Sequence, residues 1–180
     1  GELYLEKHRG TYTSQARSKR YNRKIEFELR ELELACVLGW LISGHSYPQE
    51  DLERLWKELL LYQFHDILPG SSIKRVYDES LARYQIMMDK ILALKRKAYR
   101  SWVNKIDTGD MEQPVVVTNS LSWARDEWLL VDGQWVKVNI PPMGYTVVDV
   151  SESKCQVHDI AAQHNVLEND KLRVRFADDG

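Results

Sequence analysis

Cysteine is scarce in this chain of 180 residues, which has only Cys36 and Cys155. Two cysteines cannot build a disulfide framework, so nothing indicates an oxidising compartment. Cys36 falls on the apolar face of a helical pattern, and we expect it to be a buried thiol. The low cysteine content therefore favours a reducing compartment, and we predict a cytoplasmic location.

Long apolar runs and a strong net charge are also absent. No run is long enough to cross a bilayer and no signal-peptide pattern is present, so no membrane partner is expected. The formal net charge of -2 gives no reason to expect nucleic acid. Five basic residues cluster near the start of the first helical pattern, where a solvated helix face explains them better than a phosphate site: Arg17, Lys19, Arg20, Arg23 and Lys24.

Apolar periodicity, in contrast, is strong in the first part of the chain and predicts three helices. Thr13 or Ser14 is a plausible N-cap for the first helix, and Ser71 or Ser72 for the third. Short connections between the helices predict an antiparallel three-helix bundle over residues 1–106. The predicted buried positions are Tyr21, Ile25, Leu29, Leu32, Cys36, Leu52, Leu55, Trp56, Leu59, Leu60, Ile73, Val76, Tyr77, Tyr84, Met87, Met88, Ile91 and Trp102.

After a polar linker at residues 107–110 the sequence becomes typical of strands. Asp132-Gly133 separates two apolar runs and is a hairpin signal. We predict an α+β chain in which the bundle precedes an antiparallel β-sandwich-like region, with a small β domain at 107–156. Residues 157–180 would begin a further, truncated β-sandwich. The chain opens mid-pattern without Met, which favours a fragment of a larger protein.

The segment Gln63–Ser71, QFHDILPGS, is the most informative for function. It places His65 beside Asp66 where the second helix is expected to end, so both side chains could point into one cavity. A neutral imidazole is a good zinc ligand, and a carboxylate can orient a ligand or accept hydrogen bonds from a substrate. A His-Asp pair alone at a helix end is more often structural than functional, with Asp66 as a cap and His65 half-buried. The other histidines, His8, His45, His158 and His164, lie at no ligand spacing from His65 on the same helix.

Several segments, taken together in this order, resemble the zinc-dependent α-mannosidases of glycoside hydrolase family 38. The resemblance covers nearly the whole chain. It rests on GELYLE (1–6), HRGTYTS (8–14), Asn22-Arg23, QFHDILPGS (63–71), NSLSW (119–123) and PMGY (142–145).

This resemblance implies a retaining α-mannosidase that hydrolyses terminal α-D-mannosyl residues of oligosaccharides. His65 is similar to the histidine that completes a zinc site of two His and two Asp. Asp66 is similar to the carboxylate that hydrogen-bonds sugar hydroxyls. The resemblance assigns the remaining Zn²⁺ ligands, the nucleophile and the general acid to an N-terminal α/β catalytic domain of the parent chain. The segment itself is therefore expected to hold no catalytic residue and to be inactive alone.

Phe64 departs from one pattern within the family. The Golgi and lysosomal branches commonly carry another His before the ligand histidine, so Phe64 resembles the bacterial and cytosolic branch. The implied partners are a mannose-containing oligosaccharide and the parent's own catalytic domain, and the parent could form a homo-oligomer.

Two alternatives stay open at the level of sequence. The segment could be a non-catalytic scaffold or a carbohydrate-contacting module, because it contains no evident nucleophile, acid or full ligand set. A metal-dependent phosphohydrolase using the His-Asp pair would need further His and Asp ligands on neighbouring helices, and the bundle supplies no convincing set.

Overall fold

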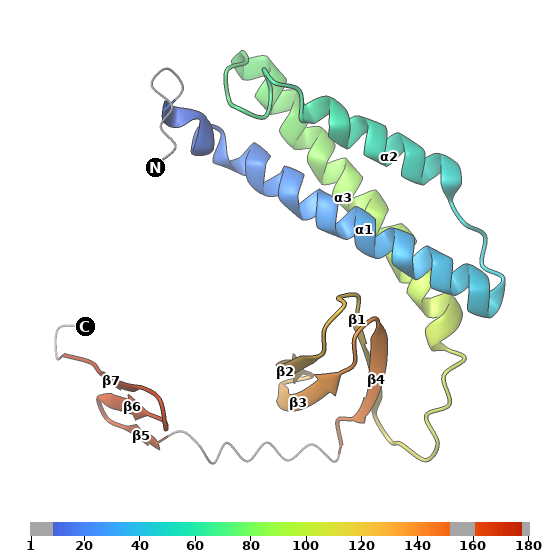
Figure 1. The fold of residues 1–180 in the computed structure, drawn as a ribbon, viewed down its shortest axis with the longest axis vertical. Coiled ribbons are helices and arrows are strands. Elements are labelled where there is room, and N and C mark those ends of the chain that lie inside the picture. Colours follow the sequence, from blue (N-terminus) through green and yellow to red (C-terminus); the bar gives the residue numbers. More distant parts are fainter. Residues whose placement is uncertain (1–8, 152–160, 178–180) are drawn as a thin grey trace. The chain divides into compact units, whose positions relative to one another are not determined.

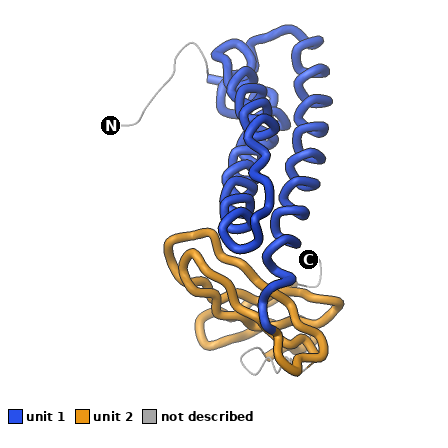
Figure 2. Tube along the Cα trace, turned by 90° about the vertical axis from the view of Figure 1, so that its right-hand side faces the viewer, with its two compact units in different colours: residues 1–107 blue, residues 108–180 orange. Residues whose placement is uncertain are grey.

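The computed structural model describes residues 9–151 and 161–177, and the chain divides into two compact units. Unit 1 is Gly1–Asp107 and unit 2 is Thr108–Gly180 (Figure 2). The first is helical and the second contains antiparallel strands, so the predicted α+β class is confirmed. The division at 106/107 and 156/157 stays a prediction, and the second boundary lies outside the described residues.

Unit 1 is a three-helix bundle that follows a short 3₁₀ turn, η1 (Arg9–Tyr12). Its helices are α1 (Ala16–Ser43), α2 (Gln49–Tyr62) and α3 (Lys74–Val103). Consecutive helices run in opposite directions, so α1 and α3 run the same way and α2 returns beside them (Figure 1). This is the antiparallel bundle that the short connections predicted.

The core of the bundle is the set of apolar stripes expected from the helical period. Buried stripe residues are Ile25, Leu29, Leu32, Cys36, Leu52, Leu55, Leu59, Tyr77, Tyr84, Met87, Met88, Ile91 and Trp102. Leu60 is 57% exposed and Ile73 69% exposed, so these two predictions are wrong. On α2 the buried residues recur every three or four positions, and Leu60 lies about 100° around the helix from Leu59.

Both predicted serine or threonine N-caps are wrong. The residue before α1 is Gln15, with φ 53°, and the residue before α3 is Ile73; neither makes a side-chain capping hydrogen bond. Other hydrogen bonds hold the residues just before each helix. The Ser14 N–H donates to the Gly10 carbonyl at 2.7 Å, and the Ser72 N–H donates to the Tyr77 hydroxyl at 2.8 Å.

Unit 2 begins with two antiparallel strand pairs over one small core. β1 (Pro114–Asn119) pairs with β4 (Gly144–Asp149), and β2 (Arg125–Val131) pairs with β3 (Gln134–Ile140). Their inward residues form one apolar cluster around Val136, Val138, Ile140 and Val150, as in a sandwich. Asp132 and Gly133 join β2 to β3 with φ values of 47° and 83°, so the predicted hairpin turn is confirmed.

A separate three-stranded antiparallel sheet contains β5 (Ala161–Gln163), β6 (Val166–Glu168) and β7 (Arg173–Arg175). Apolar runs near Val166-Leu167 and at residues 172–176 predict β6 and β7 from the sequence, whereas β5 was missed. Its three residues, Ala-Ala-Gln, are too few and too weakly apolar to give an alternating pattern. None of the helices in the described part of the chain has the length and apolar character needed to cross a membrane.

Candidate functional site

His65 and Asp66 lie in a turn, not at a helix end as predicted. The last residue of α2 is Tyr62, and the following backbone folds back on itself before α3 begins. The N–H groups of Ile67 and Leu68 both donate to the Phe64 carbonyl, at 2.9 and 3.1 Å. This pattern fixes the path of the backbone on either side of the pair.

The side chains of His65 and Asp66 project into solvent. They are 77% and 61% exposed, and His65 Nε2 lies 3.7 Å from Asp66 Oδ2. The Phe64 ring packs against the imidazole, with ring centroids 4.1 Å apart. A half-buried histidine and a shared cavity were both expectations from sequence, and the described residues provide neither. Solvent exposure leaves both groups accessible to a ligand or to another part of a longer chain.

The start of the loop is attached to α1 through Gln63. Its Nε2 donates to Asn22 Oδ1 at 3.1 Å and to Glu26 Oε1 at 2.8 Å. Asn22 is buried, so a mobile side chain at this point would leave a buried amide poorly satisfied. These bonds therefore hold the residue two positions before His65.

The middle and end of the loop are attached to α3 through Tyr77. The Tyr77 hydroxyl accepts the Ser72 N–H at 2.8 Å and lies 3.2 Å from the Ile67 carbonyl, to which it donates. Tyr77 itself is buried in the bundle. A buried aromatic side chain has few alternative rotamers, so it holds the loop from a rigid helix.

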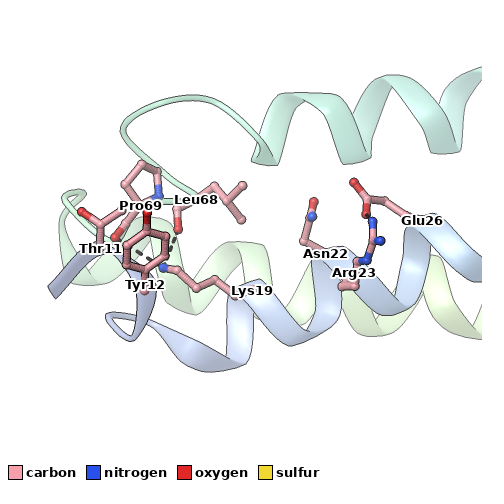
Figure 3. A pocket seen from close by; sticks show the side chains of 8 residues that line it. All are labelled: Thr11, Tyr12, Lys19, Asn22, Arg23, Glu26, Leu68 and Pro69. Atoms are coloured by element: carbon pink, nitrogen blue, oxygen red, sulfur yellow. Dashed lines mark hydrogen bonds and ion pairs between the residues drawn. The ribbon is translucent and has the colours of Figure 1, made fainter. Parts of the chain in front are cut away.

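The third attachment is Lys19 on α1, whose ammonium reaches the loop from the first helix. Lys19 Nζ donates to the Leu68 carbonyl at 2.8 Å and to the Pro69 carbonyl at 3.4 Å (Figure 3). Burial lowers the pKa of Lys19 below its usual range. Lys19 was predicted to belong to a solvated basic face, and that prediction is wrong for Lys19, which is half-buried and bonded to these loop carbonyls.

Gly70 allows the loop to lie close to Ser14, just before the start of α1. Its φ is 101°, a conformation that side chains disfavour. A Cβ at this position would lie 2.6 Å from the Ser14 Cβ. The sequence signal Pro69-Gly70 predicted a break, but the close contact with residues about 55 positions earlier could not be deduced from it.

A surface hollow of about 440 Å³ lies beside this loop. It is lined by Thr11, Tyr12, Lys19, Asn22, Arg23, Glu26, Leu68 and Pro69 (Figure 3). Arg23 is paired with Glu26 at 2.8 Å across the helix surface. His65 and Asp66 are not among the lining residues, although Leu68 and Pro69 of the same loop are.

The described parts of the chain bring no further metal donors to His65. Within residues 9–151 and 161–177, no group of three or more His, Cys, Asp or Glu side chains could hold a metal ion. His45 is half-buried after α1, and His164 is exposed between β5 and β6. His8 and His158 lie outside the described residues. His65 and Asp66 therefore form at most part of a metal site in these regions.

Comparison with known proteins identifies the family. Residues 6–101 match the model of the α-mannosidase middle domain. "Alpha-mannosidase G" of Dictyostelium discoideum is 50% identical over 86 residues, covering 47% of this chain and 8% of that protein. The human "Alpha-mannosidase 2C1" is 34% identical over 155 residues, covering 82% of this chain and 14% of that protein.

The architecture agrees with this match. A crystal structure of a glycosyl hydrolase family 38 protein from Enterococcus faecalis superposes with a TM-score of 0.73 at 17% identity, covering 92% of this chain and 28% of that one. The chain belongs to the α-mannosidases of glycoside hydrolase family 38 and includes their middle domain. It spans 8% and 14% of the lengths of the two curated relatives named above.

Proposed function

We propose that this chain is part of a zinc-dependent retaining α-mannosidase that removes terminal α-D-mannosyl residues from oligosaccharides. His65 is one zinc ligand and Asp66 binds the sugar. The observation that carries the proposal is a loop attached to α1 and α3 at several points, which nevertheless presents two exposed polar side chains. Membership of family 38 and the names of the relatives support the same activity.

The donor chemistry of the loop fits a shared zinc site. Zinc prefers imidazole and carboxylate donors and takes about three or four protein ligands. His65 offers an exposed imidazole, and the described residues supply no complete set around it. The remaining ligands would come from an N-terminal α/β domain of the longer parent protein. When bound, zinc would act as a Lewis acid toward sugar hydroxyls.

Asp66 would orient the substrate. Its carboxylate is 61% exposed and lies 3.7 Å from the neighbouring imidazole. An ionised carboxylate accepts strong hydrogen bonds from hydroxyl groups, and two oxygens can serve two adjacent hydroxyls of one mannose ring. The role of the bundle is to keep this acceptor in one place, since orientation contributes substantially to rate.

The two carboxyl groups that carry out retaining hydrolysis lie elsewhere in the parent in this proposal. Retaining glycosidases place a nucleophile and an acid–base residue about 5 Å apart on either side of the scissile bond. A family-38 parent would supply both from its catalytic domain. The bundle and its loop would bind and position the substrate, and would not themselves exchange a proton with it.

Cytoplasmic location and self-association belong to the same proposal. Cys36 is a buried free thiol, and Phe64 occupies the position that carries another His in the Golgi and lysosomal branches. Both features favour a protein that stays in a reducing compartment. Cell fractionation would test the location: recovery of the parent with secretory-pathway membranes would contradict it.

A second candidate, a non-catalytic scaffold, is favoured by one observation. Fewer than three potential donors gather at any point of the described residues. Under that proposal the segment supplies no zinc ligand, so His65→Ala would leave the zinc content and the mannosidase activity of the parent protein unchanged. The zinc content and mannosidase activity of the parent protein carrying His65→Ala therefore distinguish the two candidates.

The test is hydrolysis of an aryl α-mannoside by the purified full-length protein, before and after treatment with a strong chelator. The proposal predicts activity that is lost on metal removal and restored by added zinc. NMR detection of the first-formed sugar should give the α-anomer, the signature of retention. Activity that survives complete metal removal would exclude zinc dependence, and no activity in the metal-loaded protein would contradict the proposed mannosidase function.

A further inference from the structure

We propose that Lys19 is a positioning residue for this site. By holding the backbone carbonyls of Leu68 and Pro69, it keeps His65 and Asp66 in one orientation. This inference rests on the proposed function, in which those two side chains reach zinc and substrate. It adds a residue on a different helix, 46 positions before His65, to the set that determines the geometry of the site.

The ammonium of Lys19 has its hydrogen-bonding capacity fully used. It carries three N–H donors, and three carbonyl oxygens surround it. Ser14 contributes one, immediately before α1, while Leu68 and Pro69 contribute the other two. Lys19 therefore joins the entry of α1 to the loop between α2 and α3. A charged donor forms stronger hydrogen bonds than a neutral one, which suits it to this bridging role.

A shift at Leu68 would reach the functional pair through the backbone. The Leu68 and Ile67 N–H groups share the Phe64 carbonyl as acceptor, which closes a tight turn around His65 and Asp66. Gln63 holds the entrance to this turn and Tyr77 contacts Ile67. In the described structure, the side-chain hydrogen bonds to the carbonyls of Leu68 and Pro69 come from Lys19. Without Lys19, the Leu68 and Pro69 carbonyls would lose their hydrogen bonds to α1.

Close packing at Gly70 restricts the position of the loop that Lys19 holds. The loop lies so near Ser14 that a single Cβ at Gly70 would clash. Lys19 bonds to the Ser14 carbonyl at the same junction. Lys19 and Gly70 thus act at the same contact between the loop and the residues just before α1. Lys19 forms hydrogen bonds there, and Gly70 leaves the space that a side chain would fill.

The experiment uses the full-length parent protein and three variants. Lys19→Met keeps an unbranched apolar stem but removes the donors, and Lys19→Arg restores charge and donors. Lys24→Met is the matched control, because Lys24 is exposed on the same helix and forms no hydrogen bond or ion pair within the described residues. Two quantities are measured: hydrogen exchange of the Ile67 and Leu68 amides, and the zinc dissociation constant by chelator competition.

We expect Lys19→Met to accelerate exchange at Ile67 and Leu68 and to weaken zinc binding about 10- to 100-fold, the usual effect of losing a group that orients a ligand. Lys19→Arg should recover most of the affinity, and Lys24→Met should match the wild type. If circular dichroism finds Lys19→Met unfolded, Lys19→Gln, which keeps one neutral donor, replaces it with the same expected direction.

Unchanged amide exchange or unchanged zinc affinity in a folded Lys19→Met or Lys19→Gln protein would overturn the positioning role. His65→Ala separates this failure from failure of the proposed function. If His65→Ala lowers zinc affinity and the Lys19 variant does not, only the role of Lys19 is wrong. If His65→Ala binds zinc as tightly as the wild type, the proposed function itself is wrong at this site, and the Lys19 inference falls with it.

Discussion

Unit 1 contains residues that are buried in its core and residues whose backbone is fixed while the side chain stays exposed. Cys36 and Tyr84 are fully buried, and burial raises the pKa of both side chains. His65 and Asp66 are exposed although the backbone beneath them is attached to two helices. A residue whose backbone is fixed but whose side chain makes few contacts is typical of a site that binds something else.

Cys36 gives a prediction at this scale. Burial, followed by the nearby charge of Glu33, raises its pKa to about 11, so the native thiol should stay protonated at pH 9. Iodoacetamide should therefore modify native Cys36 at least about tenfold more slowly than the unfolded chain, because the thiolate is the reactive form. Peptide mass spectrometry of the two samples measures the difference.

The same pKa shift makes stability depend on pH. Above about pH 8.5 an unfolded chain loses the thiol proton, while the folded chain retains it until about pH 11. The contribution of Cys36 to stability is therefore fully present below this window and falls as the pH rises through it.

Rapid modification of native Cys36 by iodoacetamide at pH 9 would contradict its assignment as a buried, protonated thiol.

Helices with a long apolar pattern could be predicted from the sequence. Features that depend on tertiary contacts, such as the residues at helix starts, could not. The stripes of α1 and α3 extend over many turns, so the period identified most of their buried residues. The caps were wrong because Gln15 and Ile73 precede helices whose entries are fixed by neighbouring turns. The sequence indicated a surface charge at Lys19 and a core aromatic at Tyr77, and it contained no signal that both side chains hold the same loop.

The two neighbouring leucines at the end of α2 test its orientation. Leu59 is fully buried and Leu60 is mostly exposed. Leu59→Ala should reduce the opening free energy of the bundle by about 2–5 kcal/mol, since it leaves a cavity. Leu60→Ala should change it by less than about 0.5 kcal/mol. Native-state hydrogen exchange at the amides of Met87 and Ile91 measures both, and equal effects would contradict the described packing of α2.

Gly70 tests the junction between the loop and α1. Gly70→Ala should cost about 1–3 kcal/mol of local stability, because it adds backbone strain at a positive φ and a clash with Ser14. Faster exchange of the Ile67 amide would report this loss. Gly109→Ala is the control: it has a φ of 55°, but no described atom lies within 4 Å of the added Cβ. Normal exchange at Ile67 in Gly70→Ala would mean that the junction does not hold the loop.

The whole molecule explains why sequence reasoning could identify a family but not complete a site. Ordered motifs across both units indicated family 38, and the middle-domain match confirmed the family. The fold class was also confirmed, because helical and strand periods differ clearly. The zinc site stayed a prediction, since His65 and Asp66 stand at one end of the bundle and the described residues provide no third donor. The proposed zinc binding would then require residues of a longer parent protein.

The most direct test of the proposed zinc site is the zinc content of the full-length protein carrying His65→Ala, beside the wild type and His164→Ala. His164 is an exposed histidine in unit 2, so it controls for the loss of any surface imidazole. We predict that His65→Ala alone loses bound zinc and α-mannosidase activity while its circular dichroism stays normal. Full zinc content and full activity in His65→Ala would contradict the assignment of His65 as a ligand.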